Sequence, residues 1–481
     1  MSVYDEYQMT IGVECHVQLA TKTKLFSAAD NDSRFAEPNA NVSPVDFALP
    51  GMLPVLNREA VVLAVKAGAA LGSEIALESR FDRKHYFYPD LPKGYQTTQM
   101  YQPIIGPGVV EVPLEDGSTV NVRIHHAHME EDAGKLTHHG DHSLVDLNRA
   151  GTPLIEIVSE PDIHSAEEAR AYATELYRRM TYAGVTHGDL YHGNMRFDVN
   201  ISVAKKGAAE LGKRAEVKNL NSFRSVERAA EYEFKRQVDL LESGERVVQE
   251  TRGWNDDTQT TTSQRSKEDA QDYRYMPDAD IPPIVLTPEE IADIQADMPA
   301  LPQVYRDAWA PLGLDTSVVN ALLGVQKHAM LVREVQTQAG DGAAVRIANL
   351  FASGLGSNSA DDKVDAIHED VQASELIELA KMIDAAEISS NGAKEIFKEL
   401  YAGEHNPRAI AEAKNLLQVS DEGAIAAVVD EVLADAASAK AIEDIKGGND
   451  KAIGYLVGQV MKKSRGKANP ALAQKLIRER L

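Results

Sequence analysis

The pattern of apolar residues in this 481-residue chain changes once, near Pro282, Pro283 and Pro288. Before these prolines, short runs rich in β-branched residues predict strands, because runs of this length and composition suit a sheet. After them, Ala, Glu, Asp and Lys recur at helical spacing and the strand signals fade. This change predicts an α+β domain followed by purely helical parts.

The strand signals of the first part do not alternate regularly with helices, which favours a mixed or antiparallel sheet over a doubly wound one. Three helices should interrupt the strands, and the first two have a capping residue at the start. They are expected over Asn57–Ala70, Ser165–Gly184 (where Ser165 and Glu168 form a capping box) and Ser222–Glu242. The expected strands are Met9–Leu19, Val120–Ile124, Leu154–Val158, Met195–Val203 and Ala215–Leu220.

Two breaks divide the chain. The proline-rich segment ends a catalytic domain expected over residues 1–293, and the sequence GEHNP at 403–407 forms the second break. We therefore expect a helical domain over residues 294–405 and a small helical tail domain over residues 406–481. The length suits this division, since domains typically hold roughly 100–200 residues.

Composition excludes several classes of protein. The net charge of −24 argues against a surface covered by nucleic acid, which needs concentrated Lys and Arg. The single cysteine, Cys15, excludes an intrachain disulfide framework and a multi-cysteine zinc site. The N-terminal sequence does not resemble a secretory signal, and no run of about 18 apolar residues could span a bilayer. We expect a cytoplasmic protein with no membrane association.

Acidic residues interrupt segments that are otherwise apolar. Glu14 and His16 are two residues apart in the first expected strand, so their side chains share one face. Glu156 interrupts four aliphatic residues, and Glu130 and Glu131 lie in a third such segment. A buried carboxylate needs compensation, either from Arg or backbone amides or from a metal ion. Three such segments in one domain favour a metal, and carboxylates with one imidazole suit Mg²⁺ or Mn²⁺.

Common nucleotide and nucleophile motifs are absent. Gly134–Lys135 lacks the upstream glycine and the following Ser or Thr of a phosphate-binding P-loop. Cys15 and His16 are neighbours on a strand and face opposite sides, so they do not form a catalytic dyad. The chain also lacks the G-x-S-x-G motif of serine hydrolases. It therefore carries no visible hydrolase nucleophile of its own.

Several long segments resemble the B and E subunits of tRNA-dependent amidotransferases. The resemblance spans essentially the whole chain, and the motifs are long and particular to that family. They are GVECHVQL (12–19), LPGMLPVLN (49–57), FDRKHYFYPDLPKGYQ (81–96), HMEEDAGK (128–135), DLNRAGTPLIEIVSEPD (146–162), EVKNLNSF (216–223) and DYRYMPDADIPP (272–283).

The resemblance implies a two-step reaction. ATP phosphorylates the side-chain carboxylate of an Asp or Glu that is esterified to tRNA(Asn) or tRNA(Gln), and ammonia then displaces phosphate to give the amide. The missing nucleophile fits this scheme, because the family obtains ammonia from a separate amidase (A) subunit. A small C subunit completes the implied heterotrimer, and the misacylated tRNA is its substrate. The sequence leaves open whether Asp-tRNA(Asn), Glu-tRNA(Gln) or both are used.

The resemblance also assigns site residues. The catalytic Mg²⁺ ligands would be Glu14, His16, Glu131 and Glu156, with Glu130 beside them. The ion would bridge phosphate oxygens and neutralise charge that develops during transfer. Candidates for holding the nucleotide or acyl phosphate are Arg83, Lys84, Lys218 and Asn219, supported by Asp198 and Asn200 on one strand face. For Arg83 and Lys84, a solvated surface position is the alternative.

Two departures from the family pattern concern the N-terminal half. Many relatives carry four cysteines of a zinc site where this chain has Ser27, Ala29, Ser43 and Asp46. Without thiolates, no structural zinc is expected, and the loop must be held by packing or be more mobile. His85 stands where relatives usually have Asn, which changes the expected local hydrogen bonding.

The C-terminal 30 residues reverse the charge of the chain. From Ala452 to Leu481 there are seven basic residues and one acid, Glu479. An apolar helical face precedes a basic loop, and Asn469 with Pro470 predicts the start of a last helix. The resemblance places an RNA-contacting module here, for which a solvated basic end is the alternative. The candidate RNA contacts are Lys462, Lys463, Arg465 and Lys467.

Two other functions remain open at this point. A non-catalytic RNA-binding or assembly subunit would have no need of carboxylates within apolar strands. An unrelated ATP-dependent ligase acting on a free small acid would leave the basic tail without a role. ATP turnover that misacylated tRNA stimulates would exclude the first alternative. Removal of the tail should leave activity intact if the second alternative holds.

Overall fold

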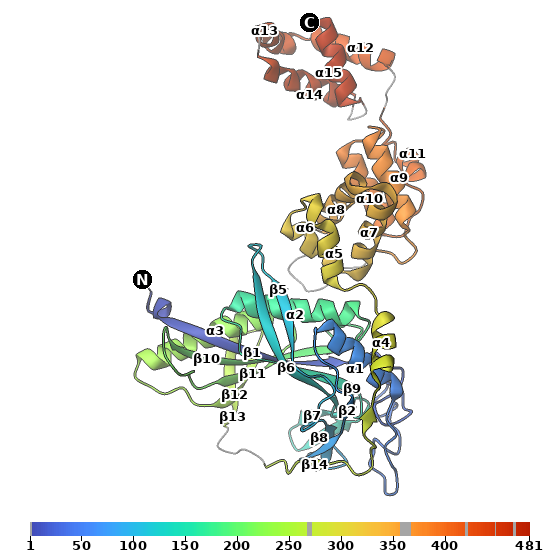
Figure 1. Ribbon diagram of the computed structural model, residues 1–481. Helices are drawn as coiled ribbons and strands as arrows, with labels where there is room; N and C mark the ends of the chain where they lie inside the picture. Colours follow the sequence, from blue (N-terminus) through green and yellow to red (C-terminus); the bar gives the residue numbers. More distant parts are fainter. Residues whose placement is uncertain (1, 267–271, 356–366, 419–421, 448, 465–467) are drawn as a thin grey trace. The chain divides into compact units, whose positions relative to one another are not determined.

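The computed structural model describes residues 2–266, 272–355, 367–418, 422–447, 449–464 and 468–481. It forms two compact units, Met1–Val304 and Tyr305–Leu481. The first unit contains a mixed sheet with helices, and the second is helical (Figure 1). The expected fold class, an α+β domain followed in sequence by helical parts, is confirmed.

The main sheet of the first unit has eight strands in the order β13-β12-β11-β10-β1-β9-β6-β5. Neighbours pair antiparallel except β11 and β12, which are parallel, so the sheet is mixed as expected. All five expected strands are present with adjusted ends, and β5, β12 and β13 are additional. The strands are β1 (Tyr7–Gln18), β5 (Gly108–Pro113), β6 (Thr119–Glu131), β9 (Pro153–Ser159), β10 (Met195–Lys205), β11 (Ala215–Leu220), β12 (Glu250–Asn255) and β13 (Thr260–Ser266).

One face of this sheet is apolar and covered by helices (Figure 1). Along β1, Val13, Cys15 and Val17 are buried in a core shared with helices α2 and α3, whereas Glu14 and His16 are only partly buried. Successive side chains of a strand point to opposite faces, so the polar residues of β1 share the face that the helices leave uncovered. The helices are α1 (Arg58–Ala70), α2 (Ala166–Tyr182), α3 (Phe223–Glu242) and α4 (Pro288–Ala296).

The three expected helices form, and their caps explain where they start. Asn57 accepts the backbone N–H of Glu59 at the start of α1, and Ser222 accepts that of Ser225 in α3. Ser165 likewise caps α2, but the carboxylate of Glu168 accepts the N–H of His164 instead of that of Ser165. The reciprocal capping box expected there is therefore wrong by one residue.

Smaller sheets border the main one. A three-stranded sheet, in the order β14-β3-β4, joins segments nearly 200 residues apart, because Met276 pairs with Arg83. Its strands are β3 (Asp82–His85), β4 (Tyr95–Thr98) and β14 (Met276–Pro277). The others are the hairpin of β7 (Lys135–His139) with β8 (His142–Asp146) and the pair β2 (Glu78–Ser79) with β15 (Ile284–Val285).

The second unit contains helices that pack around buried apolar side chains. The helices near its start are α5 (Pro302–Trp309), α6 (Thr316–Leu323), α7 (Gln326–Ala339), α8 (Asp341–Leu355), α9 (Ala373–Asp384), α10 (Ser390–Tyr401) and α11 (Pro407–Ala413). The last four helices bury a core of their own that includes Leu456, Val460 and Leu476. They are α12 (Glu422–Leu433), α13 (Ala439–Lys446), α14 (Ile453–Lys463) and α15 (Pro470–Arg480).

The expected division after residues 293 and 405 stays a prediction. Residue 293 lies within α4, and α11 packs against α9 and α10 although it follows the second expected boundary. None of the helices in the described parts of the chain is both long and apolar enough to cross a membrane. The location of the protein in the cell also stays a prediction.

Candidate active site

Antiparallel pairing brings acidic and imidazole side chains together on the uncovered face of the sheet. His16 on β1 lies opposite Glu156 on β9, and Glu156 in turn lies opposite His128 on β6. On the other side of β1, Glu14 lies opposite Asp198 on β10. Residues directly opposite on neighbouring strands have adjacent side chains. The register therefore gathers on one face residues that are more than a hundred positions apart in sequence.

His16, Glu130 and Glu156 form the tighter of two groups on this face. Nε2 of His16 lies 3.6 Å from Oε1 of Glu130 and 3.7 Å from Oε2 of Glu156. One donor atom from each residue falls within a span of 4.8 Å, which a single metal ion could bridge. Three of the expected residues, on three different strands, thus come together as one candidate metal site.

The sequence interpretation missed His128, which belongs to this group. Its Nε2 lies 3.2 Å from Oε2 of Glu156 and 3.8 Å from Oε2 of Glu130. Burial opposes the charged imidazolium, but hydrogen bonds to Glu130 and Glu156 raise the pKa of His128 to about 10. Its spacing of two from Glu130, on a strand, was the signal that could have identified it.

The side chain of Glu156 is ionised in this environment. Burial raises its pKa, but the hydrogen bond from His128 and the charges of His128, His16 and Lys84 outweigh burial and lower the pKa below its usual range. A carboxylate that stays charged at the centre of a mostly buried site is suited to hold a cation.

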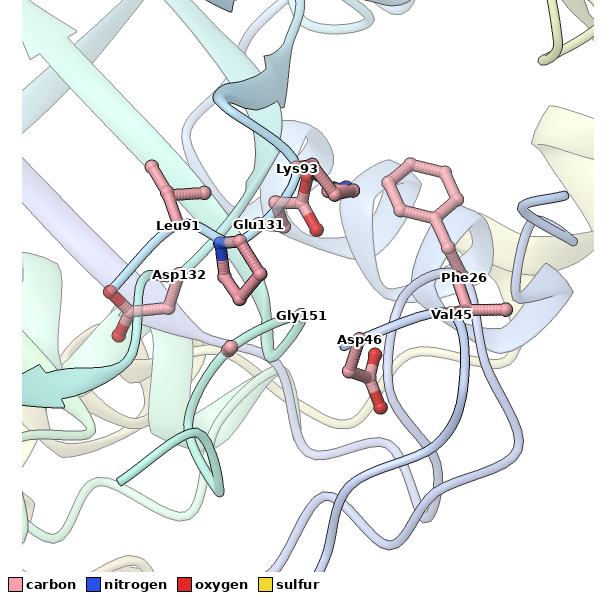
Figure 2. A pocket seen from close by; sticks show the side chains of 10 residues that line it. Phe26, Val45, Asp46, Leu91, Lys93, Glu131, Asp132 and Gly151 are labelled. Atoms are coloured by element: carbon pink, nitrogen blue, oxygen red, sulfur yellow. Dashed lines mark hydrogen bonds and ion pairs between the residues drawn. The ribbon is translucent and has the colours of Figure 1, made fainter. Parts of the chain in front are cut away.

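Glu131 lies apart from this group, and its expected role as a metal ligand stays a prediction. It follows Glu130 on β6, so its side chain projects to the opposite face. There it pairs with Nζ of Lys93 and accepts the backbone N–H of Thr97 at 3.0 Å. Figure 2 shows Glu131 and Lys93 in the lining of a small pocket that also contains Asp46. The structure does not bring Glu131 to His16 and Glu156.

A second group on the uncovered face contains Glu14, Asp198 and Glu216. Nζ of Lys218 lies 2.6 Å from Asp198 and 2.9 Å from Glu216, and its burial is outweighed by these two carboxylates, which raise its pKa. Burial and the nearby charges of Glu156 and Glu216 raise the pKa of Glu14. Glu216 is a further residue that sequence reasoning missed, although it begins the motif EVKNLNSF.

Asn200 and Asn219 support this second group. Asn200 donates its amide to Oε1 of Glu14 at 2.9 Å. Asn219 has a left-handed backbone, with φ of 68°, and lines a pocket of about 280 Å³ together with His16, Glu130 and Asp198. Members of both groups therefore line one pocket, His16 and Glu130 from the first and Asp198 from the second. It is the candidate substrate pocket.

Arg83 and Lys84 are neighbours on β3, but they point in opposite directions. Arg83 is engaged by Asp278 at 2.9 Å and by Asp280 at 2.6 Å. Burial opposes the charge of Lys84, but Glu130 and the other nearby negative groups outweigh it and raise its pKa. Of the two basic residues, Lys84 is the one near Glu130 and Glu156 of the candidate metal site.

The basic residues near the C-terminus are partly neutralised. Lys463 lies 3.4 Å from Glu431, Arg478 lies 3.0 Å from Asp450, and Arg480 lies 2.6 Å from Asp430. Lys462 is exposed at the end of α14. Arg465 and Lys467 lie outside the described residues. The expected start of the last helix is confirmed, because Asn469 accepts the N–H groups of Ala471 and Leu472.

Comparison with known proteins identifies the family. A model of the GatB/GatE catalytic domain matches residues 9–292, and a model of the GatB domain matches residues 334–481. The chain belongs to the GatB/GatE family. The catalytic-domain match covers the strands that carry both groups of acids, and the resemblance seen in the sequence motifs is confirmed.

Relatives of this GatB/GatE-family chain match it from end to end. It is 46% identical to the B subunit of the aspartyl/glutamyl-tRNA(Asn/Gln) amidotransferase of Alcanivorax borkumensis, over 99% of both chains. The subunits of the same name from Alkalilimnicola ehrlichii and Persephonella marina are 46% and 44% identical, over 99% of this chain and at least 99% of theirs.

Proposed function

We propose that this chain is the tRNA-dependent amidotransferase B subunit that activates the side-chain carboxylate of Asp-tRNA(Asn), Glu-tRNA(Gln) or both. The observation that carries the proposal is the group of His16, Glu130 and Glu156 beside a pocket, on the uncovered face of the domain that matches the family's catalytic domain. A subunit that only bound RNA would not need these partly and fully buried acids.

The residues of this group fit Mg²⁺. Two carboxylates and one imidazole offer hard ligand atoms within a span of 4.8 Å, and thiolates are absent from the described part of the site. We assign His16, Glu130 and Glu156 as the residues that hold the ion, with His128 orienting Glu156. When bound, Mg²⁺ would supply the positive charge that phosphoryl transfer from ATP requires.

In the first step, the substrate carboxylate attacks the γ-phosphorus of ATP. A carboxylate oxygen–phosphorus bond forms, the bond to the β–γ bridging oxygen breaks, and ADP leaves. Lys218 lines the pocket, and Lys84 is the cross-strand partner of Gln96, which also lines it. Both lysines can therefore place positive charge where phosphate oxygens are held. In the second step, ammonia attacks the acyl carbon, phosphate leaves, and the nitrogen loses a proton to give the amide.

The ammonia must come from elsewhere, because the sequence shows no nucleophile for glutamine hydrolysis. Cys15, the single cysteine, is fully buried, and burial raises the pKa of its thiol well above the ordinary value. We therefore propose an amidase (A) subunit as the source and a small C subunit as the third member of a heterotrimer. The names of the relatives describe each of them as one lettered subunit of an amidotransferase, which supports an assembly of several subunits.

The test is an amidation assay with the copurified subunits. Asp-tRNA(Asn) and Glu-tRNA(Gln) are supplied separately with ATP, Mg²⁺ and glutamine, and the aminoacyl product is identified after hydrolysis of the ester. Amide formation that requires both ATP and this chain supports the proposal and identifies the substrate. ATP turnover that is indifferent to misacylated tRNA would refute it.

A further inference from the structure

A row of three tyrosines flanks the small sheet β14-β3-β4, with Tyr101 after β4 and Tyr273 and Tyr275 before β14. The ring centres of Tyr101 and Tyr275 are 6.5 Å apart with planes at 73°, and those of Tyr275 and Tyr273 are 6.1 Å apart at 67°. In an edge-to-face pair the edge of one ring contacts one face of the other, so each pair covers a single ring face. Tyr101 is 63% exposed, and Tyr273 and Tyr275 are partly buried. The row thus runs from the protein surface inward.

The inner end of the row reaches the candidate active site. Nζ of Lys84 lies 5.0 Å from the ring centre of Tyr273, and the charges of Glu130 and Glu156 act on this lysine. Gln96, the cross-strand partner of Lys84, lines the same pocket as Glu130. The tyrosines therefore form a path that leads from solvent to the pocket.

The segment that carries two of the tyrosines is held in a fixed conformation. The backbone N–H of His85 donates to the carbonyl of Tyr273 at 2.9 Å, and its ring Nδ1 donates to the carbonyl of Arg274 at 3.0 Å. Arg274 has a positive φ of 42°, which non-glycine residues seldom adopt without such support. His85, the residue that departs from the family pattern, thus fixes the positions of Tyr273 and Tyr275.

Cationic and aromatic groups also meet beside Tyr273 and Tyr275, because Arg274 lies between them in sequence. Arg274 is exposed, and its guanidinium carbon lies 5.9 Å from the ring centre of Phe87, which is itself 76% exposed. Exposed aromatic rings beside Arg are the combination that binds unpaired nucleotides, because bases stack on the rings and cations contact phosphates.

We propose that Tyr101, Tyr275 and Tyr273 form a stacking platform for the unpaired nucleotides at the 3′ end of the substrate tRNA. The proposal rests on the proposed function, which requires the esterified amino acid at the 3′ end to enter the pocket. Three rings in a row suit several successive bases, whereas ATP has only one base to stack. The platform would guide the 3′ end past Arg274 and Phe87 to Lys84 and the carboxylates.

The test measures tRNA affinity with the assembled complex. Two RNAs are compared, full-length deacylated tRNA and the same tRNA without its last three nucleotides, for the wild type and the Tyr101→Ala/Tyr275→Ala variant. Stacking on each ring contributes enough that the truncation should weaken wild-type binding about 5- to 100-fold. In the double Ala variant, full-length tRNA should lose a similar factor, and the truncation should cause no further loss.

The matched control is Tyr101→Phe/Tyr275→Phe, which keeps the rings and should bind both RNAs like the wild type. The KM for ATP should be unchanged in both variants, and the salt dependence of binding should keep its slope, because stacking releases no counterions. An Arg274→Gln variant should reduce that slope by about one.

Three results would overturn the platform. The first is equal losses for the two RNAs in the Ala variant, which would show that the rings do not contact the last three nucleotides. The second is a raised KM for ATP with unchanged tRNA affinity, which would assign the rings to the nucleotide. The third is a wild-type complex that binds neither RNA, which would remove the proposed function together with the platform.

Discussion

The hydroxyl of Ser27 lies 3.2 and 3.1 Å from the two carboxylate oxygens of Asp46. The same carboxylate accepts the backbone N–H of Ser43 at 2.8 Å and lies 3.5 Å from Nζ of Lys24, which is fully buried. Gly151 closes the site, since it has φ of 82° and a Cβ there would lie 2.8 Å from Asp46 (Figure 2). Asp46 thus joins segments of the loop in which relatives carry the cysteines of a zinc site.

Replacing Asp46 by Asn should destabilise the first unit by about 3–5 kcal/mol, because Lys24 would remain buried without a partner charge. Urea unfolding followed by the fluorescence of Trp254 measures the loss. The double variant Asp46→Asn/Lys24→Met should recover most of it, since neither charge remains. A double variant as unstable as Asp46→Asn alone would contradict the pairing.

Metal analysis of the purified chain should find no stoichiometric zinc, because the positions of the four thiolates hold Ser27, Ala29, Ser43 and Asp46. A variant with cysteine at all four positions provides the positive control and should gain one zinc per chain. One tightly bound zinc in the wild type would mean that other ligands hold it.

Glu130 and Glu131 should respond differently to the same change. Glu130→Gln, like Glu156→Gln, should lower ATP-dependent phosphorylation by more than about 100-fold and raise the Mg²⁺ concentration required, with tRNA affinity unchanged. Glu131→Gln should instead cost about 3 kcal/mol of stability, because it leaves Lys93 unpaired. Initial rates across a Mg²⁺ titration, together with thermal melting, separate the two effects. Normal phosphorylation by Glu130→Gln would refute the assignment.

The second unit should lose stability in mild acid because of His328. Its Nε2 accepts hydrogen bonds from Ile367 N–H at 3.2 Å and from the Tyr401 hydroxyl at 3.0 Å, and burial lowers its pKa to about 4. The unfolded chain takes up this proton near the ordinary pKa of about 6.5, whereas the folded chain does so only near 4. The stabilisation is therefore complete above about pH 6.5 and is lost as the pH falls toward 4.

The total loss from this residue should be about 3 kcal/mol. Urea unfolding between pH 7 and 4, followed by Trp309 fluorescence in a Trp254→Phe background, measures it. His328→Gln keeps an acceptor atom but does not titrate, so its stability should vary less over this range. Identical pH profiles for the two proteins would show that His328 is not the titrating group.

Charge reversal at Lys462 and Lys463 should raise the KM for misacylated tRNA while leaving kcat nearly unchanged. The slope of log affinity against log salt concentration should become shallower by about one for each phosphate contact removed. The double variant Lys440→Glu/Lys446→Glu makes the same charge change on α13, outside the basic stretch, and serves as the control. An unchanged KM for the reversed variant at moderate salt would show that these lysines are solvent-exposed and do not bind tRNA.

Spacing within one strand could be predicted from sequence, whereas register between strands could not. The two-residue spacing of Glu14 and His16 correctly placed both on one face. The choice of Glu131 over Glu130 came from resemblance, and the geometry of β6 places only Glu130 beside His16 and Glu156. Glu216 was missed for a related reason, since only the pairing of β10 with β11 brings it near Asp198.

The small sheet β14-β3-β4 also could not be predicted from the sequence. The strand β3 has the sequence DRKH, whose polar residues give no apolar alternation. It forms because it is bracketed by β4 and β14, and the latter pairing joins segments nearly 200 residues apart. A local sequence pattern predicts contacts only between residues that are near in sequence. The tyrosine row and the position of Lys84 could therefore not be predicted.

The alternation along β1 has a consequence for how this chain can change over evolution. Val13, Cys15 and Val17 fill the core, while Glu14 and His16 belong to the two groups of acids on the uncovered face. The same alternation along the strand therefore determines both the core and the candidate site. Substitutions can alter one set and spare the other. A one-residue insertion or deletion within the strand cannot, because it would place charged groups under α2 and α3 and apolar groups in the pocket at once. We therefore expect length variants in this family to be confined to the loops and absent from β1.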